Sequence, residues 1–509
     1  MKLCLFLQRR FAPIGHELVR ALHEKYGVEE FCGYVELRSS FAFLSHQHDI
    51  RYTKLILGEE ILAGYREEKL DMAYLNSLEK KYGISSLWPL INLDRVIRYN
   101  LLRRAYPSDS SPYSREDMLK MLQRLARALE RFLDEEKPDA IFFSVVSDLG
   151  SYLLYEMAKQ RGIKILGLYN PRLGERYAIT DDYFQYRSLE KAMRSLQKPE
   201  HIQLRGKAAR YLQEFQKEPA YYLEASGGAA EFTRAPVGAT AHLRFLSPRR
   251  FIRSVVWTLR SFYLYWGNSH RDDFTTIPPW YELYDKFVRK VRVVRGYRDF
   301  YSPVPAEGQS FAYFPLQLEP EALPMLLAPN YAFEQVWTIK QIARALPVSC
   351  MLYVKDHPVM VGRRPRSYYK ELLKIPNVRL LDPAASSLKL CAAAKLVCAI
   401  TGTAGMEAAF LKKPVIVFAD VFYTLLPNVI RCTSVEELPE LITSALHESG
   451  YEEAATVDFI AAIYKESVFV DLTKLWTVQG SHMSAEEKRE LEPLADLIAD
   501  RLQLSHARA

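Results

Sequence analysis

Short apolar runs alternate with amphipathic stretches over residues 1–183 and again from about residue 307. Uninterrupted apolar runs are typical of parallel strands, because helices cover both faces of such strands. Strands predicted at 140–146 and 164–169 flank a predicted helix at 151–161, which makes a β-α-β unit. The second half repeats the alternation, with strands predicted at 311–314, 349–354, 378–381, 396–400 and 415–418. The pattern therefore predicts two α/β units.

The chain divides into four predicted segments, since 509 residues are too many for a single core. Residues 1–183 and 307–450 are the two α/β domains. Residues 184–306 are a helical insertion or linker, and residues 451–509 are a helical extension. An apolar content of 49% and a charged content of 25% are ordinary for a globular protein.

Basic residues are concentrated in the middle segment. Residues 184–300 contain 21 Lys and Arg against 11 Asp and Glu, while the whole chain has a formal charge of +7. A local surplus predicts an anionic surface or partner, and not a general affinity for nucleic acid. A helix is predicted from Ser247 to Gly267, with apolar and aromatic side chains at helical spacing and arginines on other faces. This helix either lies on a membrane surface or packs between the domains. The small-residue stretch 225–240 is predicted to be a loop.

The remaining composition points to the cytoplasm. Six scattered cysteines without a CxxC pair are typical of reduced thiols. The first apolar run is too short for a signal peptide, and no window is long and apolar enough for a spanning helix. In transferases that use a divalent metal, closely spaced aspartates at the end of a strand hold the ion. The adjacent pairs Asp181-Asp182 and Asp272-Asp273 do not follow predicted strands. We expect a cytoplasmic protein, peripheral at the inner face of the membrane, that needs no metal and no cofactor.

The most informative stretch connects two predicted strands, at 396–400 and 415–418. Between them Thr401, Gly402, Thr403 and Gly405 predict a tight turn that leads into a helix, whose free amides suit a phosphate. Glu407 follows on the same helix. The residue three positions before it is an alanine, so a capping box does not explain this carboxylate. It is predicted to accept hydrogen bonds from a ribose diol.

Other polar residues follow neighbouring strands of the same predicted sheet. Because the carboxyl ends of parallel strands share one edge, we expect these residues to converge. Pro358 holds His357 in an extended conformation, where its imidazole is predicted to contact a phosphate and, when protonated, to offset the charge of a departing nucleotide. The other donor-site candidates of these strand ends are Ser386, Ser387 and, as a phosphate contact, Arg363. An edge filled with apolar side chains would exclude this role.

The order of the motifs PLQLEPEA, YVKDHP, NVRLLDPAASS and AITGTAGMEAAFLKKPVIVFADVFY resembles that of the capsule polysaccharide biosynthesis family. This family includes bacterial Kdo transferases of capsule export systems. The resemblance is specific over about residues 313–440 and loose in the N-terminal half, where PRLGERYAITDD, predicted to be a loop, matches best. It implies a GT-B architecture, in which two Rossmann-like domains face a cleft and the second binds a nucleotide sugar. It also implies that the His-Pro pair contacts the nucleotide phosphate and that the TGTAGMEA turn holds phosphate and ribose.

By the same resemblance, the chain is predicted to be a glycosyltransferase. It would move a sugar from CMP-Kdo or another nucleotide sugar onto a lipid-linked acceptor or onto a capsular or other cell-surface polysaccharide. Glu319 and Glu321 lie near the place of the family's acidic catalytic residue, beside Gln317. Asp148, in the first turn of the β-α-β unit, is the catalytic candidate of the acceptor side, with Arg172 and Arg176 as contacts. Three alternatives stay open: a CDP-polyol phosphotransferase of teichoic-acid type, a sugar-nucleotide epimerase, and a non-catalytic scaffold of capsule assembly.

Overall fold

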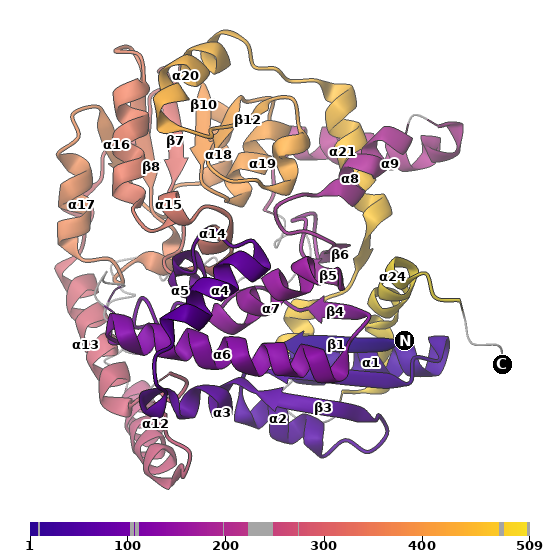
Figure 1. Ribbon diagram of the computed structural model, residues 1–509. Helices are drawn as coiled ribbons and strands as arrows, with labels where there is room; N and C mark the ends of the chain where they lie inside the picture. The colour runs from indigo at the N-terminus through magenta and orange to yellow at the C-terminus, as the bar shows by residue number, and fades with distance from the viewer. Residues whose placement is uncertain are drawn as a thin grey trace.

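The structure is a computed structural model, and it describes residues 1–8, 11–101, 106, 111–196, 198–221, 248–272, 274–477 and 483–505. Two α/β domains lie one above the other in the view of Figure 1, the N-terminal domain below and the second domain above. Each contains one sheet with helices on both faces, as the alternation of apolar and amphipathic stretches predicts.

Seven strands form the sheet of the N-terminal domain, in the order β13-β6-β5-β4-β1-β2-β3. Their bounds are β1 (Lys2–Leu7), β2 (Glu30–Val35), β3 (Tyr52–Leu57), β4 (Ala140–Phe143), β5 (Lys164–Tyr169), β6 (Arg176–Thr180) and β13 (Ser467–Phe469). The strands from β3 to β5 are parallel, while β6 is antiparallel to β5 and β13 to β6. The strand order reverses between β1 and β4, and ligands of open α/β sheets bind at such a switch point.

Strand β1 shows why this domain needs helices on both faces. Leu3, Leu5 and Leu7 face a core shared with α1 and α24, while Cys4 and Phe6 face the core formed with α6 and α7. A capping box formed by Ser114 and Asp117 begins α6. The helices of this domain are α1 (Ala12–Tyr26), α2 (Arg38–Ser45), α3 (Gly58–Ala63), α4 (Met72–Tyr82), α5 (Trp88–Leu93), α6 (Arg115–Glu136) and α7 (Leu149–Gln160).

Six strands form the sheet of the second domain, all parallel, in the order β12-β11-β10-β7-β8-β9. Their bounds are β7 (Phe311–Pro315), β8 (Met351–Lys355), β9 (Val378–Leu381), β10 (Leu396–Ala399), β11 (Val415–Val417) and β12 (Val429–Arg431). The helices are α14 (Ala322–Leu327), α15 (Pro329–Ala332), α16 (Gln335–Ala345), α17 (Arg366–Leu373), α18 (Ser387–Ala393), α19 (Thr403–Phe410) and α20 (Leu438–His447). Here the switch point lies between β7 and β10.

The middle and the end of the chain connect the two domains. The bounds of their helices are α8 (Arg187–Ser195), α9 (Ile202–Lys217), α12 (Pro248–Gly267), α13 (Pro279–Arg295), α21 (Glu453–Glu466), α22 (Leu472–Thr477), α23 (Ala485–Glu490) and α24 (Glu492–Leu502). Helix α21 packs on α8 and α9, and the chain then returns to the first sheet through β13. Two Rossmann-like domains with a C-terminal segment that crosses back to the first are a GT-B-like arrangement, as predicted.

The sequence analysis predicts that the stretch PRLGERYAITDD is a loop. This prediction is wrong for part of the stretch, because Arg176–Thr180 forms β6. Arg172 and Gly174 adopt positive φ values of 60° and 67°, which turns the chain back from β5 into an antiparallel hairpin. The C-terminal extension is likewise not purely helical, since β13 pairs with β6. Strands β3 and β12 are further elements that the sequence analysis leaves out.

Helix α12 does not pack between the domains, which was one of its two predicted placements. It projects at the lower left of Figure 1 and packs against α13. None of its described side chains is buried. Ser247, its predicted N-cap, and the predicted loop at 225–240 lie outside the described residues. For the residues that the structure describes, no helix combines the length and the apolar character that crossing a membrane requires.

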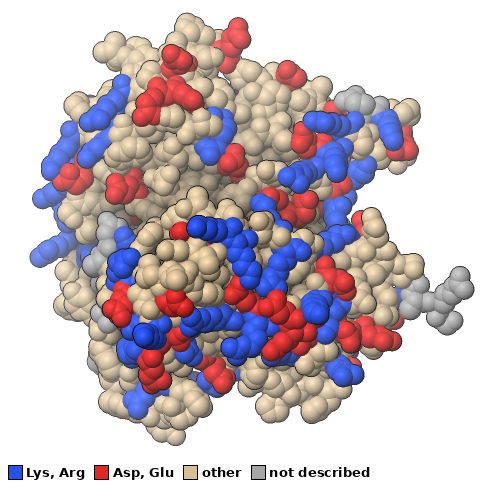
Figure 2. All heavy atoms as spheres, viewed as in Figure 1, with Lys and Arg blue, Asp and Glu red and all other residues tan. Residues whose placement is uncertain are grey.

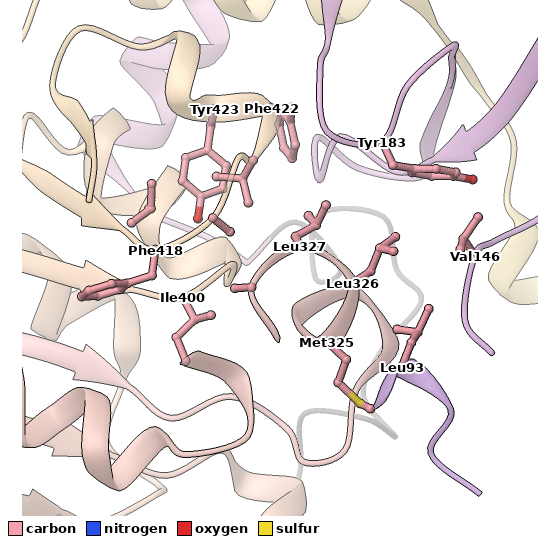
Figure 3. Close-up of a cluster of buried hydrophobic side chains, with 14 of the residues drawn as sticks. Leu93, Val146, Tyr183, Met325, Leu326, Leu327, Ile400, Phe418, Phe422 and Tyr423 are labelled. Atoms are coloured by element: carbon pink, nitrogen blue, oxygen red, sulfur yellow. The ribbon is translucent and has the colours of Figure 1, made fainter. Parts of the chain in front are cut away.

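Apolar side chains fill part of the space between the domains. Figure 3 shows α14 inserted there, with Met325 and Leu326 toward Leu93 of the N-terminal domain. Leu327 lies on the side of Phe422 and Tyr423. This cluster packs the two domains together at α14.

Candidate active site

Polar residues follow four strands of the second sheet at one edge, as predicted. His357 comes after β8, Ser386 and Ser387 after β9, the turn at 401–405 after β10 and Tyr423 after β11. All these strands are parallel, so their carboxyl ends lie at the same edge. The ring of Phe422 lies 6.2 Å from that of Tyr169, so this edge faces the N-terminal domain.

Glu407 lies on the second turn of α19 with only 6% of its surface exposed. Burial raises the pKa of its carboxyl to about 7. Burial raises the pKa of the Tyr221, Tyr313 and Tyr423 phenols, and the charge of Glu407 contributes to each of these shifts. Within the described part of the chain, no hydrogen bond or ion pair engages Glu407. Buried polar groups are nearly always hydrogen-bonded, so this carboxylate suits a ligand that donates hydroxyls.

The turn before Glu407 is shaped by two close approaches to glycine. A Cβ atom at Gly402 would lie 2.6 Å from the side-chain nitrogen of Gln317, and one at Gly405 would lie 2.7 Å from the Tyr423 hydroxyl. That hydroxyl donates a hydrogen bond to the Gly402 carbonyl at 2.7 Å. No side chain caps α19, which begins at Thr403, so its first amides are not used by a capping group. The glycines therefore admit Gln317 and Tyr423 to a turn that keeps donors for an anion.

His357 is extended, as Pro358 predicts, with φ −71° and ψ 133°. Its Nδ1 accepts a hydrogen bond from the Val359 amide at 3.2 Å, which leaves the proton on Nε2. Burial, with the charges of Lys355 and Arg364, lowers the pKa of His357 to about 4. The predicted protonated form is therefore not the form of this site at neutral pH. A neutral imidazole offers a phosphate one hydrogen bond through Nε2 and no charge.

Three further side chains lie at this edge, and the sequence analysis does not name any of them as a site residue: Tyr221, Tyr313 and Lys355. The Tyr313 hydroxyl lies 3.0 Å from the Ser387 hydroxyl, and the Ser387 amide donates to the Tyr221 hydroxyl at 3.1 Å. Ser386 is the N-cap of α18, where its hydroxyl accepts from the Lys389 amide. The two tyrosines thus hydrogen-bond with Ser387 of the serine loop. No motif identifies Tyr221, because it comes from the linker between the domains.

Lys355, the third of these side chains, ends β8 and is 5% exposed. Its ammonium donates to the carbonyls of Asp356 at 3.2 Å and Pro383 at 3.3 Å, which fixes the loop after β9 beside His357. Burial lowers the pKa of Lys355 to about 8. A lone charge at the end of an apolar strand is the sequence feature that could have identified it. In the described structure, no hydrogen bond joins His357 directly to Glu407.

Arg364, which follows β8, is fully buried. Its guanidinium pairs with Asp356 and with Glu319, the latter at 3.1 Å, and donates to the Gln317 carbonyl at 2.6 Å. The Glu319 carboxylate also accepts from Gln335 and from the Tyr106 hydroxyl. These bonds leave Glu319 little capacity for chemistry and favour a positioning role. Arg363, the residue before Arg364, is half-buried, and its carbonyl accepts a hydrogen bond from Arg292.

Glu321 faces the other domain, two residues beyond Glu319. Burial raises the pKa of its carboxyl, and the charges of Arg172 and Arg95 from the N-terminal domain oppose this shift. Glu321 lines a cavity of about 360 Å³ between the domains, together with Tyr99 and Phe333, whose rings stack 4.4 Å apart. Glu321, a catalytic candidate of the sequence analysis, thus lies between the domains, where the charge of the acceptor-side candidate Arg172 acts on it.

Asp148 lies beyond the carboxyl end of β4, at the switch point of the first sheet. Its carboxylate accepts from the Ser151 amide and hydroxyl, both at 2.9 Å, and thereby caps α7. Burial and the neighbouring Asp94 raise the pKa of Asp148. Arg176 lies elsewhere: its guanidinium binds the Ser467 and Tyr464 carbonyls and so attaches β13 to the sheet.

The described residues contain no group of three or more His, Cys, Asp and Glu side chains that is placed to hold a metal ion. Asp181 and Asp182 do follow a strand, β6, contrary to the sequence analysis. The Asp182 carboxylate is engaged by the Tyr155 hydroxyl at 3.0 Å and by Lys159 at 2.9 Å.

The two facing domains and the polar rim of the second sheet define a GT-B-like protein with a candidate nucleotide site. Residues 331–426 match the family described as "Capsule polysaccharide biosynthesis protein". The match confirms the resemblance predicted from the motifs, over the residues that it spans. These residues include His357, the serine loop and Glu407. Among proteins with curated descriptions, none matches this sequence.

Solved structures resemble this chain at low similarity. One is the KpsC beta Kdo 2,7 transferase of Thermosulfurimonas dismutans, at 14% identity over 75% of this chain and 90% of that chain, with a TM-score of 0.31. The beta Kdo 2,4 transferase of the same organism has 14% identity over 71% and 91%, with a TM-score of 0.36. The UDP-GlcNAc 2-epimerase of Neisseria meningitidis has 12% identity over 92% and 99%, with a TM-score of 0.23. Values this low carry no information about the substrate.

Proposed function

We propose that this chain is a glycosyltransferase that moves a sugar from a nucleotide sugar, of the CMP-Kdo type or another, onto a capsular or other cell-surface polysaccharide. The observation that carries the proposal is the unpaired, buried Glu407 beside an uncapped helix start, within the segment that matches the capsule family. A stability cost of this kind is common where a ligand supplies the missing partner. A nucleotide supplies a ribose diol for the carboxylate and a phosphate for the amides.

Each part of the donor has a place in this proposal. The phosphate lies against the start of α19, within reach of the Nε2 proton of His357, while the ribose hydroxyls donate to Glu407. Thr401, Thr403 and Ser387 line the same rim. Hydrogen bonds and the dipole of α19 stabilise the leaving phosphate in this proposal, without a metal ion.

In the transfer itself, the bond between the anomeric carbon and the phosphate oxygen breaks, and the acceptor hydroxyl forms the new glycosidic bond. Glu321 is the carboxylate that faces the transferred sugar, as base or as nucleophile, because Glu319 is engaged by Arg364. The acceptor enters from the N-terminal domain, past Arg172 and Asp148. The acceptor proton leaves through one of these carboxylates.

Calorimetric titration with CMP-Kdo, CMP-sialic acid, UDP-N-acetylglucosamine and CDP-glycerol tests the proposal. We expect one CMP- or UDP-sugar to bind, and Glu321→Gln to abolish transfer while it keeps that binding. Glu319→Gln is the matched control for a carboxylate two residues away. Preference for CDP-glycerol, or turnover of a nucleotide sugar without acceptor, supports the phosphotransferase or the epimerase instead. A folded protein that binds none of the four supports a scaffold.

The proposal includes a location at the inner face of the membrane, with α12 and α13 as the contact. Helix α12 exposes 61% of Ile252, 66% of Leu259 and 77% of Tyr263 on one stripe. Arg249, Arg253 and Arg260 lie beside this stripe, and α12 contains no acidic residue. Trp280, Tyr284 and Phe287 of α13 are also exposed. An apolar stripe with flanking arginines suits the interface of an anionic bilayer.

Sedimentation with vesicles tests this location. We expect the wild-type protein to bind phosphatidylglycerol vesicles better than phosphatidylcholine vesicles, and Leu259→Glu with Tyr263→Glu to prevent binding. Val348→Glu is the control, since Val348 is a fully exposed apolar residue of the second domain. Self-association that the same double variant abolishes, without vesicle binding, would instead identify a contact between two copies.

A further inference from the structure

A second cavity, of about 470 Å³, lies away from the donor edge. It is lined by the beginning of β5, helix α8 and the C-terminal residues Lys465 and Arg501. Tyr169, at the opposite end of β5, contacts the second domain, so this cavity opens beside the N-terminal sheet and not at the candidate active site. In Figure 2, Lys and Arg gather where α8 and α9 lie, above the hollow that separates them from α24.

The lining of this basic groove carries five cationic side chains and two carboxylates. The cations are Lys164, Arg187, Lys191, Lys465 and Arg501. Of the two carboxylates, Glu466 pairs with Arg501. Asp181 is exposed.

Four of these cations carry charge that no carboxylate offsets. Among the described residues, Lys164, Arg187, Lys191 and Lys465 have no carboxylate within ion-pairing distance. Arg187 donates to Gln185, and Lys465 donates to Ser195 and contacts His201. Unpaired cations that line one concave surface reinforce each other's potential and attract anions.

The arrangement of the charges distinguishes a chain of anions from a single anion. A lone phosphate is bound by donors that converge on one point, often with backbone amides. Here the cations belong to β5, to α8 and to the C-terminal helices, and they surround a floor of buried Ile165, Leu166 and Ile179. Donors spread in this way match groups spaced along a polymer, as in an acidic polysaccharide with one carboxylate or phosphate per sugar unit.

We propose that the basic groove between β5, α8 and the C-terminal helices binds a stretch of an acidic polysaccharide, apart from the active site. It would hold a part of the polymer that is distant from the end where sugar is added. The choice of a polysaccharide among anionic polymers rests on the proposed function. The binding itself depends on neither the donor nor transfer, because it rests on the charge and shape of the groove.

The test is the binding of end-labelled polysialic acid, which carries one carboxylate per residue, measured by fluorescence anisotropy. We expect binding that weakens steeply with added salt, and no binding of neutral dextran. Arg187→Glu with Lys191→Glu should weaken binding by roughly tenfold or more, since two attractive charges become repulsive. Arg194→Glu, an exposed arginine of α8 outside the groove, is the control and should leave affinity within about twofold. Lys164→Glu repeats the test from β5.

The outcomes separate this inference from the proposed function, because the assay contains no nucleotide sugar. Unchanged affinity in both groove variants, with unchanged thermal unfolding, would overturn it. Tighter binding of single-stranded DNA than of polysialic acid would also overturn it, as would equal affinity for one sialic acid and for the polymer.

Discussion

Two buried carboxylate sites of the second domain differ in what neutralises them. Asp356 and Glu319 share the buried guanidinium of Arg364, and further hydrogen bonds reach both carboxylates. Glu407 has no such partner in the described structure, and burial alone raises its pKa to about 7. The paired site stabilises the loops after β7 and β8. The unpaired site costs stability, which is what a group kept for a ligand does.

The largest effect is expected from breaking the paired site. Arg364→Met removes the cation shared by the buried Asp356 and the partly buried Glu319, which should lower the free energy of unfolding by about 3–5 kcal/mol. Urea denaturation measures this change. Arg366→Met, which removes an exposed pair with Asp299, is the control and should have little effect. Equal losses in the two variants would show that burial of the pair does not matter.

Removing the charge of Glu407, the unpaired site, should raise the free energy of unfolding at high pH. The folded protein holds the proton of Glu407 up to about pH 7, while the unfolded chain releases it near 4.5. Stability is therefore lost as pH rises between these values, by up to about 3 kcal/mol. Glu407→Gln should match the wild type near pH 5 and be more stable at pH 8. Glu440→Gln, at an exposed glutamate, should show no such dependence, and a Gln variant less stable at pH 8 would contradict the burial of an unpaired charge.

A methyl group added at Gly405, in the turn before Glu407, should destabilise the protein. Gly405→Ala forces the Tyr423 hydroxyl away from the Gly402 carbonyl, and we expect a loss of about 1–3 kcal/mol in the free energy of unfolding. Gly206→Ala is the control within α9, where nothing lies within 4 Å of the added atom. It should stabilise the protein by about 0.5–1 kcal/mol. Thermal unfolding distinguishes the two, and equal behaviour would mean that Tyr423 does not constrain the turn.

The smallest effect is expected from His357. Because its pKa of about 4 leaves the imidazole neutral, it contributes one uncharged hydrogen bond to a phosphate. His357→Ala should weaken nucleotide-sugar binding by roughly threefold to tenfold. Calorimetry at pH 6 and pH 8 should give the same factor at both values. A factor that grows toward pH 6 would show that a bound phosphate protonates the ring.

Much of the fold follows from the apolar pattern, and the misses have physical causes. The strands at 2–7, 164–169 and 378–381 are those predicted, because long buried runs leave few alternatives. Strand β6 was missed since its existence depends on the hairpin turn at Arg172 and Gly174. Strand β13 depends on a partner almost 300 residues away, which no local pattern reveals.

The site was predictable where it lies on strand ends and not where it depends on tertiary contacts. Glu407 and the turn before it were recognised by their place after β10. Tyr221 comes from the linker, so only the folded chain brings it to Ser387. Arg364 was not recognised for a similar reason, because three arginines in a short loop resemble a solvated surface until the burial of one is seen.

The central claim is that the carboxylate of Glu407 binds the nucleotide of a sugar donor. Its most direct test is calorimetric titration of the wild type and Glu407→Gln, at pH 6 and pH 8, with the nucleotide sugar that binds best. We predict that the wild type binds about tenfold more tightly at pH 8, where the carboxylate is ionised, and that the Gln variant binds weakly at both. Equal affinity of the two proteins at pH 8 would contradict the account.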